Sequence, residues 1–433
     1  MHLNAVLAAA TLLVLNGSAW AQTPGERLPP PQAVQGWSEP RPAQQAPTEK
    51  PAADPWQSFA PVRPGIVAGQ FTIFPSVTAG AFYDDNVFAA TTNRQGSWGG
   101  FVRPELGVRT DGQGYSAEAS GFLEKRWYSR FSSEDQINGS VGASATVMPD
   151  SDTQLIGRAR YTRAHESRGS GESELLRFDD PVGFNVFDAS GAINKRFNRW
   201  WTSVGVAGSW ISYDTPTIGG IPIPQNYRDG TIGVVSGRIG YVVAPQTSVF
   251  VEWSGNDRNF EVDIFDSRGY RVVGGVLLEQ GPGSRVRGEA YVGYMNQHYQ
   301  GVTFNTVSTI TYGGALAVQL APRLTGVVEG RRVALESALN GGVSVVESLI
   351  GGRLDYALQP NLIVGAGATY LVDEFLGAGR TDATFSPLVS VKYLVNPFLT
   401  LGFDYRNVGF DSRATGVPAY HRNVYLLSLN ARI

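Results

Sequence analysis

The sequence predicts an all-β protein: a transmembrane, antiparallel, up-and-down β-barrel of about 18 strands, with about 16 as the alternative, preceded by a disordered Pro-rich leader. Three features predict this fold. Apolar and polar residues alternate with a period of two, the alternating runs are long, and short turns alternate with long polar stretches. A tilted strand needs roughly 9–11 residues to cross a bilayer, whereas strands of soluble proteins usually have about five or six.

The N-terminal segment has the pattern of an export signal. The apolar run LNAVLAAATLLVLNGSAWAQ ends in the small-residue motif AWA, so we expect cleavage after Ala21 and a signal peptide over residues 1–21. A basic segment before the apolar run is missing. Residues 22–70 are rich in Pro, Gln and Ala (LPPPQ, EPRPAQQAP, EKPAADP), which predicts a disordered periplasmic leader.

Residues 71–433 have the alternating apolar and polar pattern of membrane-spanning β-strands. In TITYGGALAVQL (Thr309–Leu320) one parity is apolar and the other is small or polar, and the closing NVYLLSLNARI alternates in the same way. The second parity carries Arg, Glu and Asp, which excludes a soluble barrel with a continuous apolar core. The apolar parity avoids charge except at Lys125, Lys195 and Arg332, near strand ends. A β-propeller would need four short strands in each repeat, and each repeat here holds two long ones.

Short turns are predicted at DGQG, MPDSD, NR, APQ, GPGS, APR, QPN and NP, and longer loops such as HESRGSGESELLRFDDP lie between them. Aromatic residues recur at fixed distances from these turns, as in YVVAP, YALQP and YLVNP. Such positions suit the two aromatic girdles of a membrane barrel, where the ring is apolar and the polar tip meets water. The girdle candidates are Tyr241, Tyr356 and Tyr393 at one end, and Trp127, Tyr161, Trp210, Trp253, Tyr294, Tyr370 and Tyr405 at the other.

The inward parity carries many charges. The lumen-lining candidates are Arg103, Glu105, Arg109, Glu124, Arg126, Arg158, Arg160, Arg238, Glu252, Arg287, Glu289, Glu329, Arg331, Arg353, Asp355, Asp404 and Arg406. Opposite charges stand two residues apart in Arg103/Glu105, Arg287/Glu289, Glu329/Arg331, Arg353/Asp355 and Asp404/Arg406. They can select polar solutes, or they can merely neutralise one another on a polar wall. Both interpretations stay open at this point.

Composition excludes several functional classes. The chain has no cysteine, which removes disulfides, zinc-thiolate sites and a cysteine nucleophile. A net charge of −3 without a basic cluster argues against nucleic-acid binding. No P-loop, GxSxG or HExxH motif occurs, and His165, His298 and His421 are scattered beside predicted loops. We therefore expect no enzyme, no cofactor and no metal site.

The segment FYDDNVFAA (Phe82–Ala90) places two carboxylates and a carboxamide side by side. Adjacent residues of an extended chain point to opposite sides, so the spacing argues against a Ca²⁺ site, which needs ligands at alternate positions. We expect Asp84, Asp85 and Asn86 to leave the membrane at the end of the first strand, where their side chains are solvated.

The segments YDDNVF, WISYDTP and GEAYVGYMNQHY, together with the closing NVYLLSLNARI, resemble those of the putative β-barrel porin 2 family of outer-membrane proteins. The resemblance covers about residues 71–433. It implies an outer-membrane barrel, and it adds export of exopolysaccharide as a function, because some members are thought to serve as export conduits. Many outer-membrane barrels end in Phe or Trp, whereas this chain ends in Ile433.

These observations together predict an aqueous pore for hydrophilic solutes in the outer membrane of a Gram-negative cell. The alternative is a conduit for exopolysaccharide that periplasmic export proteins gate. A barrel enzyme and an occluded structural barrel rank lower. The expected partners are outer-membrane lipid, the barrel-assembly machinery during insertion and, for the alternative, periplasmic polysaccharide-export proteins.

Overall fold

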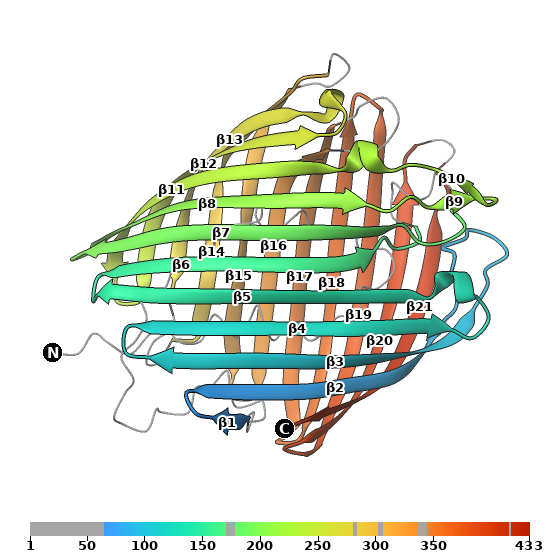
Figure 1. Cartoon of the computed structure of the whole chain (residues 1–433), viewed down its shortest axis with the longest axis horizontal. Coiled ribbons are helices and arrows are strands. Elements are labelled where there is room, and N and C mark those ends of the chain that lie inside the picture. The colour runs from blue at the N-terminus through green and yellow to red at the C-terminus, as the bar shows by residue number, and fades with distance from the viewer. Residues whose placement is uncertain (1–64, 170–177, 280–283, 302–305, 337–343, 415–416) are drawn as a thin grey trace.

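The computed structural model describes residues 65–169, 178–279, 284–301, 306–336, 344–414 and 417–433. Within these residues, 18 long antiparallel strands form a closed barrel (Figure 1), as the sequence predicts. Each strand pairs with its neighbours along the chain, and β2 pairs with β21 to close the wall. The wall strands are β2 (Phe71–Asp84), β3 (Ser97–Gly112), β4 (Tyr115–Tyr128), β5 (Gln136–Asp150), β6 (Thr153–His165), β7 (Gly183–Phe197), β8 (Trp200–Tyr213), β11 (Gly230–Ala244), β12 (Thr247–Phe260), β13 (Ser267–Leu278), β14 (Val286–Tyr299), β15 (Val307–Ala321), β16 (Leu324–Glu336), β17 (Ser344–Gln359), β18 (Leu362–Leu376), β19 (Arg380–Asn396), β20 (Leu399–Ser412) and β21 (Tyr420–Arg432).

A few short elements complete the described chain. The strand β1 (Ile66–Ala68) pairs with the start of β2, so the last residues of the segment expected to be a disordered leader form a hairpin. The signal peptide and the rest of that leader lie outside the described residues. In the loops lie the hairpin of β9 (Thr217–Ile218) and β10 (Ile221–Pro222) and the 3-10 helices η1 (Ser132–Glu134), η2 (Asn226–Arg228) and η3 (Asp263–Phe265).

The two ends of the barrel differ in their connections. At one end, which we call the turn end, two residues join β3 to β4, β5 to β6, β7 to β8, β11 to β12, β15 to β16, β17 to β18 and β19 to β20. Asn198 and Gln246 adopt positive φ in two of these turns, which lets two residues reverse the chain. The predicted turn at GPGS lies mostly outside the described residues. The opposite end, the loop end, carries the longer connections.

The two faces of the wall follow the period-two pattern. On the outer face, apolar side chains such as Val251, Ile310 and Leu427 are exposed. On the inner face, charged side chains such as Arg238 and Glu252 are buried. Since successive side chains of a strand point to opposite faces, a closed barrel needs this alternation to present apolar surface outward. Among the described residues, no helix is long and apolar enough to cross a membrane.

Aromatic rings lie flat on the inner wall where a neighbouring strand carries glycine. A Cβ added to Gly240 on β11 would stand 2.2 Å from the ring of Trp201 on β8, and one added to Gly275 would meet the ring of Phe250 at 2.5 Å. Glycine is needed at these two positions because a larger residue would displace the ring. Trp201 and Phe250 then pack with Val273 into an apolar cluster that covers this side of the interior.

Candidate functional site: the interior of the barrel

The inner face of β11–β14 carries a network of ion pairs. The Arg238 guanidinium donates to Glu252 Oε2 (2.5 and 2.8 Å) and to Glu289 Oε2 (2.8 Å). Arg271 donates to the other oxygen of Glu252 at 2.6 Å and to the Tyr291 hydroxyl at 3.2 Å. These charges therefore satisfy one another, between adjacent strands at Glu252 and across two intervening strands in the pair of Arg238 with Glu289. A buried ion pair needs such partners if it is not to destabilise the fold.

A second group surrounds Glu124 on β4. Arg126 Nη2 lies 3.4 Å from Glu124 Oε1, and Arg103 Nη1 lies 4.0 Å from Glu124 Oε2. Both guanidinium groups also lie over aromatic rings: Arg103 is 3.7 Å from the centroid of Phe122, and Arg126 is 5.1 Å from that of Phe82. The rings supply attraction where the ion-pair distances are long.

The predicted pairing between residues two apart is realised only in part. Arg353 bonds Asp355 in a bidentate pair, with 2.7 Å from Nη2 to Oδ1, and the Arg103–Glu105 pair is long at 4.0 Å. Arg331 instead bonds Glu347 on the next strand, with 2.8 Å between Nη2 and Oε1. The reach of an arginine covers neighbouring strands as well as its own, so cross-strand partners compete with partners two residues away.

The lumen-lining candidates differ in their exposure. Buried are Arg103, Glu124, Arg126, Arg238, Glu252 and Glu289; half-buried are Glu105, Arg160, Arg287, Arg331, Arg353, Asp355, Asp404 and Arg406; exposed are Arg109, Arg158 and Glu329. All of them lie on the strand parity opposite to the exposed apolar residues. Their contact with a permeating solute stays a prediction, and the exposed group offers the most side-chain surface for it.

The inner face of β5–β7 is more open than that of β11–β14. Arg158 on β6 is exposed, and its direct cross-strand neighbours are Ser144 on β5 and Ser190 on β7, both half-buried. Four residues nearer the loop end on β5, the Ser140 hydroxyl lies 3.1 Å from that of Thr162. Small hydroxyl-bearing residues thus leave room for solvent beside a basic side chain.

The girdle candidates lie on the outer face of the wall. Exposed there are Trp127, Tyr161, Trp210, Trp253, Tyr294, Tyr356, Tyr370 and Tyr393, and half-buried are Tyr241 and Tyr405. Tyr405 packs against Tyr425 of β21 with 5.0 Å between ring centroids, and its hydroxyl donates to Asn423. Their contact with lipid headgroups stays a prediction.

The expectation that Asp84, Asp85 and Asn86 are solvated is wrong. Asp84 and Asn86 are 1% and 0% exposed. Asp85 accepts bonds from the backbone and side-chain nitrogens of Asn423 on β21, both at 2.6 Å. Asn86 donates to the carbonyls of Ala90 and His421 at 2.8 and 2.9 Å. The segment continues the contact between the first and last wall strands beyond the end of β2. It therefore extends the seam, by which we mean the β2–β21 junction where the barrel closes.

Loops gather over the loop end of the barrel. The Tyr420 hydroxyl of β21 donates to the carbonyl of Gly169, in the connection between β6 and β7, at 3.1 Å. Since β2–β5 stand between β21 and β6 in the wall, residues 166–169 of this connection reach across part of the opening. Arg168 ties the same connection to η1 through Glu134, with 2.6 Å between Nη2 and Oε1.

A second contact fixes the β9–β10 hairpin beside these loops. Asp179 accepts from the backbone nitrogens of Gly219 and Gly220, both at 3.0 Å, and from the Thr217 hydroxyl at 2.8 Å. The two backbone bonds, followed by the hydroxyl, lower the pKa of Asp179 below its usual value. The described part of the chain holds no cluster of three or more His, Asp or Glu side chains that could bind a metal ion.

Sequence reasoning missed several interior residues. Arg271 and Glu347 stand on the inward parity of their strands, so the alternation could have identified them. The Asp84–Arg422 pair joins residues from opposite ends of the chain, and only the closure of β2 on β21 brings them together. No pattern within either segment signals this contact.

Comparisons with known proteins give distant structural matches and one family match. Among solved structures, OpdK of Pseudomonas aeruginosa with vanillate is 13% identical, with a TM-score of 0.43, and the match covers 83% of this chain and 99% of that one. For OpdQ of the same organism the values are 13%, 0.45, 84% and 100%. No curated protein sequence matches. The family described as putative beta-barrel porin 2 matches residues 58–433, the whole barrel together with the hairpin before it, and the chain belongs to this family.

Proposed function

We propose that the chain forms a water-filled pore in the outer membrane through which small hydrophilic solutes diffuse. The observation that carries this proposal is the exposed Arg158 among hydroxyl-bearing neighbours on the inner face of a closed barrel. A barrel of this size encloses a lumen wide enough for water and solutes unless it is plugged. Membership of a porin family and the apolar outer face support the outer-membrane location.

The orientation follows from the asymmetry of the barrel. Outer-membrane barrels place short turns in the periplasm and long loops outside the cell. The turn end, where β2 begins and the chain ends at Ile433, therefore faces the periplasm, and the loop end faces outward. Lipid contact by the girdle residues and insertion by the barrel-assembly machinery are parts of the same proposal.

A passive pore fits the interior better than a catalytic site. His165 bonds Asn138 and His298 bonds Thr306, each at 2.9 Å, on separate strands of the wall. Catalysis by a histidine needs a nucleophile or a substrate proton within the same reach. The alternative of an exopolysaccharide conduit receives no support from the comparisons, and no contact among the described residues favours it.

Conductance in planar lipid bilayers tests the proposal. The purified mature protein should produce discrete channel openings, and a variant without residues 22–64 separates an open lumen from one that the leader plugs. Swelling of proteoliposomes in sugars of graded size measures the cutoff for solutes. Protein that migrates as a folded, heat-modifiable barrel but gives no openings in either form would contradict the pore.

A further inference from the structure

The antiparallel ladder between β15 and β16 stops short of the loop end. Its last pair is Gly313 with Arg331, although β15 continues to Val307 and β16 to Glu336. On its other side β16 stays paired with β17 as far as the pair of Glu336 with Ser344. Residues 332–335 of β16 have therefore separated from β15 while remaining paired to residues 344–348 of β17. We call these two segments together the inner hairpin end.

Three side chains of the wall bond backbone carbonyls of the inner hairpin end. The Thr311 hydroxyl on β15 donates to Arg332 O at 2.8 Å, and the Tyr299 hydroxyl on β14 donates to Leu335 O at 3.2 Å. These bonds replace strand pairing for β16, because a buried carbonyl without a partner would be costly.

The third bond locates the inner hairpin end inside the barrel. Arg258 Nη1 on β12 donates to Ala334 O at 3.1 Å. In the wall, β13, β14 and β15 stand between β12 and β16, a separation of roughly 19 Å at the usual strand spacing. An arginine side chain cannot span that distance along the wall. The contact forms because the inner hairpin end leans across the inner faces of β15, β14 and β12.

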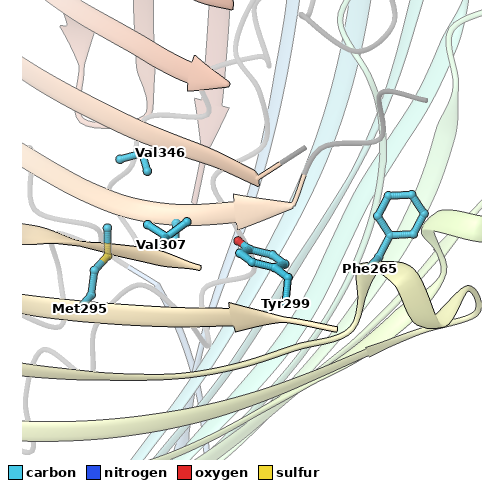
Figure 2. Close-up of a cluster of buried hydrophobic side chains, with 6 residues drawn as sticks. Phe265, Met295, Tyr299, Val307 and Val346 are labelled. Atoms are coloured by element: carbon cyan, nitrogen blue, oxygen red, sulfur yellow. The ribbon is translucent and has the colours of Figure 1, made fainter. Parts of the chain in front are cut away.

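Apolar packing agrees with this position. Ala334 and Val346 share the strand parity of the exposed Val328 and Ile350, yet they are only 4% and 1% exposed. They belong to a buried cluster with Phe265, Met295, Tyr299 and Val307, in which the side chains from η3, β14, β15 and β17 gather together (Figure 2). The outer face of the inner hairpin end thus packs against the inner face of the wall.

We propose that the inner hairpin end is the constriction of the pore, a wall segment held in the lumen by the bonds of Arg258, Tyr299 and Thr311 and by the apolar cluster. This inference rests on the proposed pore function and names the element that limits its width. Loss of any of these three hydrogen bonds lets the segment move out of the lumen. The pore then spends more time in a wider, more conductive state.

Conservative removal of two hydroxyls tests the constriction. A typical hydrogen bond contributes a net factor of about fivefold to an equilibrium, so Tyr299→Phe and Thr311→Val should each raise the ratio of time at high to time at low conductance about fivefold. Tyr405→Phe is the matched control, because its hydroxyl on the outer face of β20 bonds Asn423 and not the inner hairpin end. Heat-modifiable gel migration verifies that each variant is folded.

Thiol labelling gives a second readout. The chain has no cysteine, so Val346→Cys introduces a single thiol into the cluster. Labelling by a water-soluble maleimide should be slow in the otherwise unchanged protein and faster with Tyr299→Phe and Thr311→Val. A conducting wild type whose conductance levels and dwell times are unchanged by both substitutions overturns the constriction alone. A folded wild type without channels overturns the proposed function and the constriction with it.

Discussion

The carboxylate of Asp84 on β2 and the guanidinium of Arg422 on β21 form a buried ion pair across the seam where the barrel closes. Arg422 Nε lies 3.0 and 2.9 Å from the two carboxylate oxygens, and Nη2 donates to Oδ2 as well. Both side chains are 1% exposed. The pair joins the first and last wall strands next to the loops, so it fixes the register at which the barrel closes.

Substitution of one partner should destabilise the barrel. Asp84→Asn leaves the buried Arg422 without its counter-charge, and breaking a buried pair in this way typically costs about 3–5 kcal/mol. Unfolding by urea in lipid vesicles, followed by gel migration, measures the loss.

Asp111→Asn is the matched control. Its partner Arg109 is also an arginine on a wall strand, but both side chains of this pair are about half exposed, so the expected loss is about 0–1 kcal/mol. Equal stability losses for the two variants would contradict a special role for the seam pair.

The neighbouring Asn86 should not tolerate a carboxylate. Its amide donates to two carbonyls and its oxygen accepts from the backbone nitrogen of Ala90 at 2.8 Å. Asn86→Asp removes both donors and places a second acid beside Asp84 in a buried site, which we expect to cost about 1–3 kcal/mol or more. Asn93→Asp in the exposed part of the same loop should leave urea unfolding unchanged. A fully stable Asn86→Asp variant would show that the loop readily rearranges.

The sequence predicted the wall but not the contacts at its loop end. Period-two alternation and short turns depend on each strand alone, so TITYGGALAVQL and the APR turn identify β15 and its end at Ala321 directly. The bond from Arg258 to Ala334 depends instead on how far β16 leans from β15. That displacement results from packing among five strands, and no periodicity within β16 encodes it.

For the charged residues too, the sequence predicted the face of the wall but not the bonding partner. Parity assigned Arg238 and Glu252 to the inner face, where the structure places them, but not their bond to each other across β11 and β12. Cross-strand partners depend on register, which β-turn geometry and the hydrophobic pattern determine jointly. Asp84 was predicted to be solvated for the same reason: its partner lies 338 positions away in the chain, so the sequence around Asp84 does not indicate it.

Substitution of the glycine beneath Trp201 should destabilise the barrel. Gly240→Ala places a Cβ 2.2 Å from the ring, so the ring or the strand must move, and overpacking of this kind costs about 1–3 kcal/mol. Gly237→Ala on the same strand is the control, since nothing lies within 4 Å of its added Cβ, and alanine in a strand should be neutral or slightly stabilising. Urea unfolding compares the two, and equal stability would show that Trp201 moves without cost.

The β9–β10 hairpin should detach from the β6–β7 connection in acid. The pKa of Asp179 is lowered in the folded loop by the bonds from Gly220 and Gly219. A lowered pKa means that this contact stabilises the loop at neutral pH, and that the stabilisation is lost as the pH falls through the folded-state pKa. Limited proteolysis over a descending pH series should show cleavage near Gly219 only in acid.

Asp179→Asn should mimic acid at neutral pH, because the amide keeps a single acceptor oxygen for three donors. Cleavage of the hairpin should then occur at neutral pH. Asp180→Asn, a neighbouring exposed carboxylate, serves as the control and should remain protected. Protection of Asp179→Asn across the whole pH series would assign the stability of the hairpin to other contacts.

Arg158 should contribute to ion selectivity. It is exposed on the inner face between Ser144 and Ser190, so a permeating ion meets its charge directly, whereas Arg238 is buried against two glutamates. Arg158→Gln should lower the permeability of chloride relative to potassium, measured as a shift of the reversal potential in a salt gradient. Salt screens exposed charge over about 10 Å at 0.1 M, so the shift should shrink as salt concentration rises.

The control for this substitution is Arg268→Gln. Arg268 is also exposed and pairs with Asp257 at 2.6 Å, but it stands on the outer-face parity of β13. Its removal should leave the reversal potential unchanged. If Arg158→Gln and Arg268→Gln give the same reversal potential while both variants remain folded and conducting, the open inner face of β5–β7 is not the path of ions.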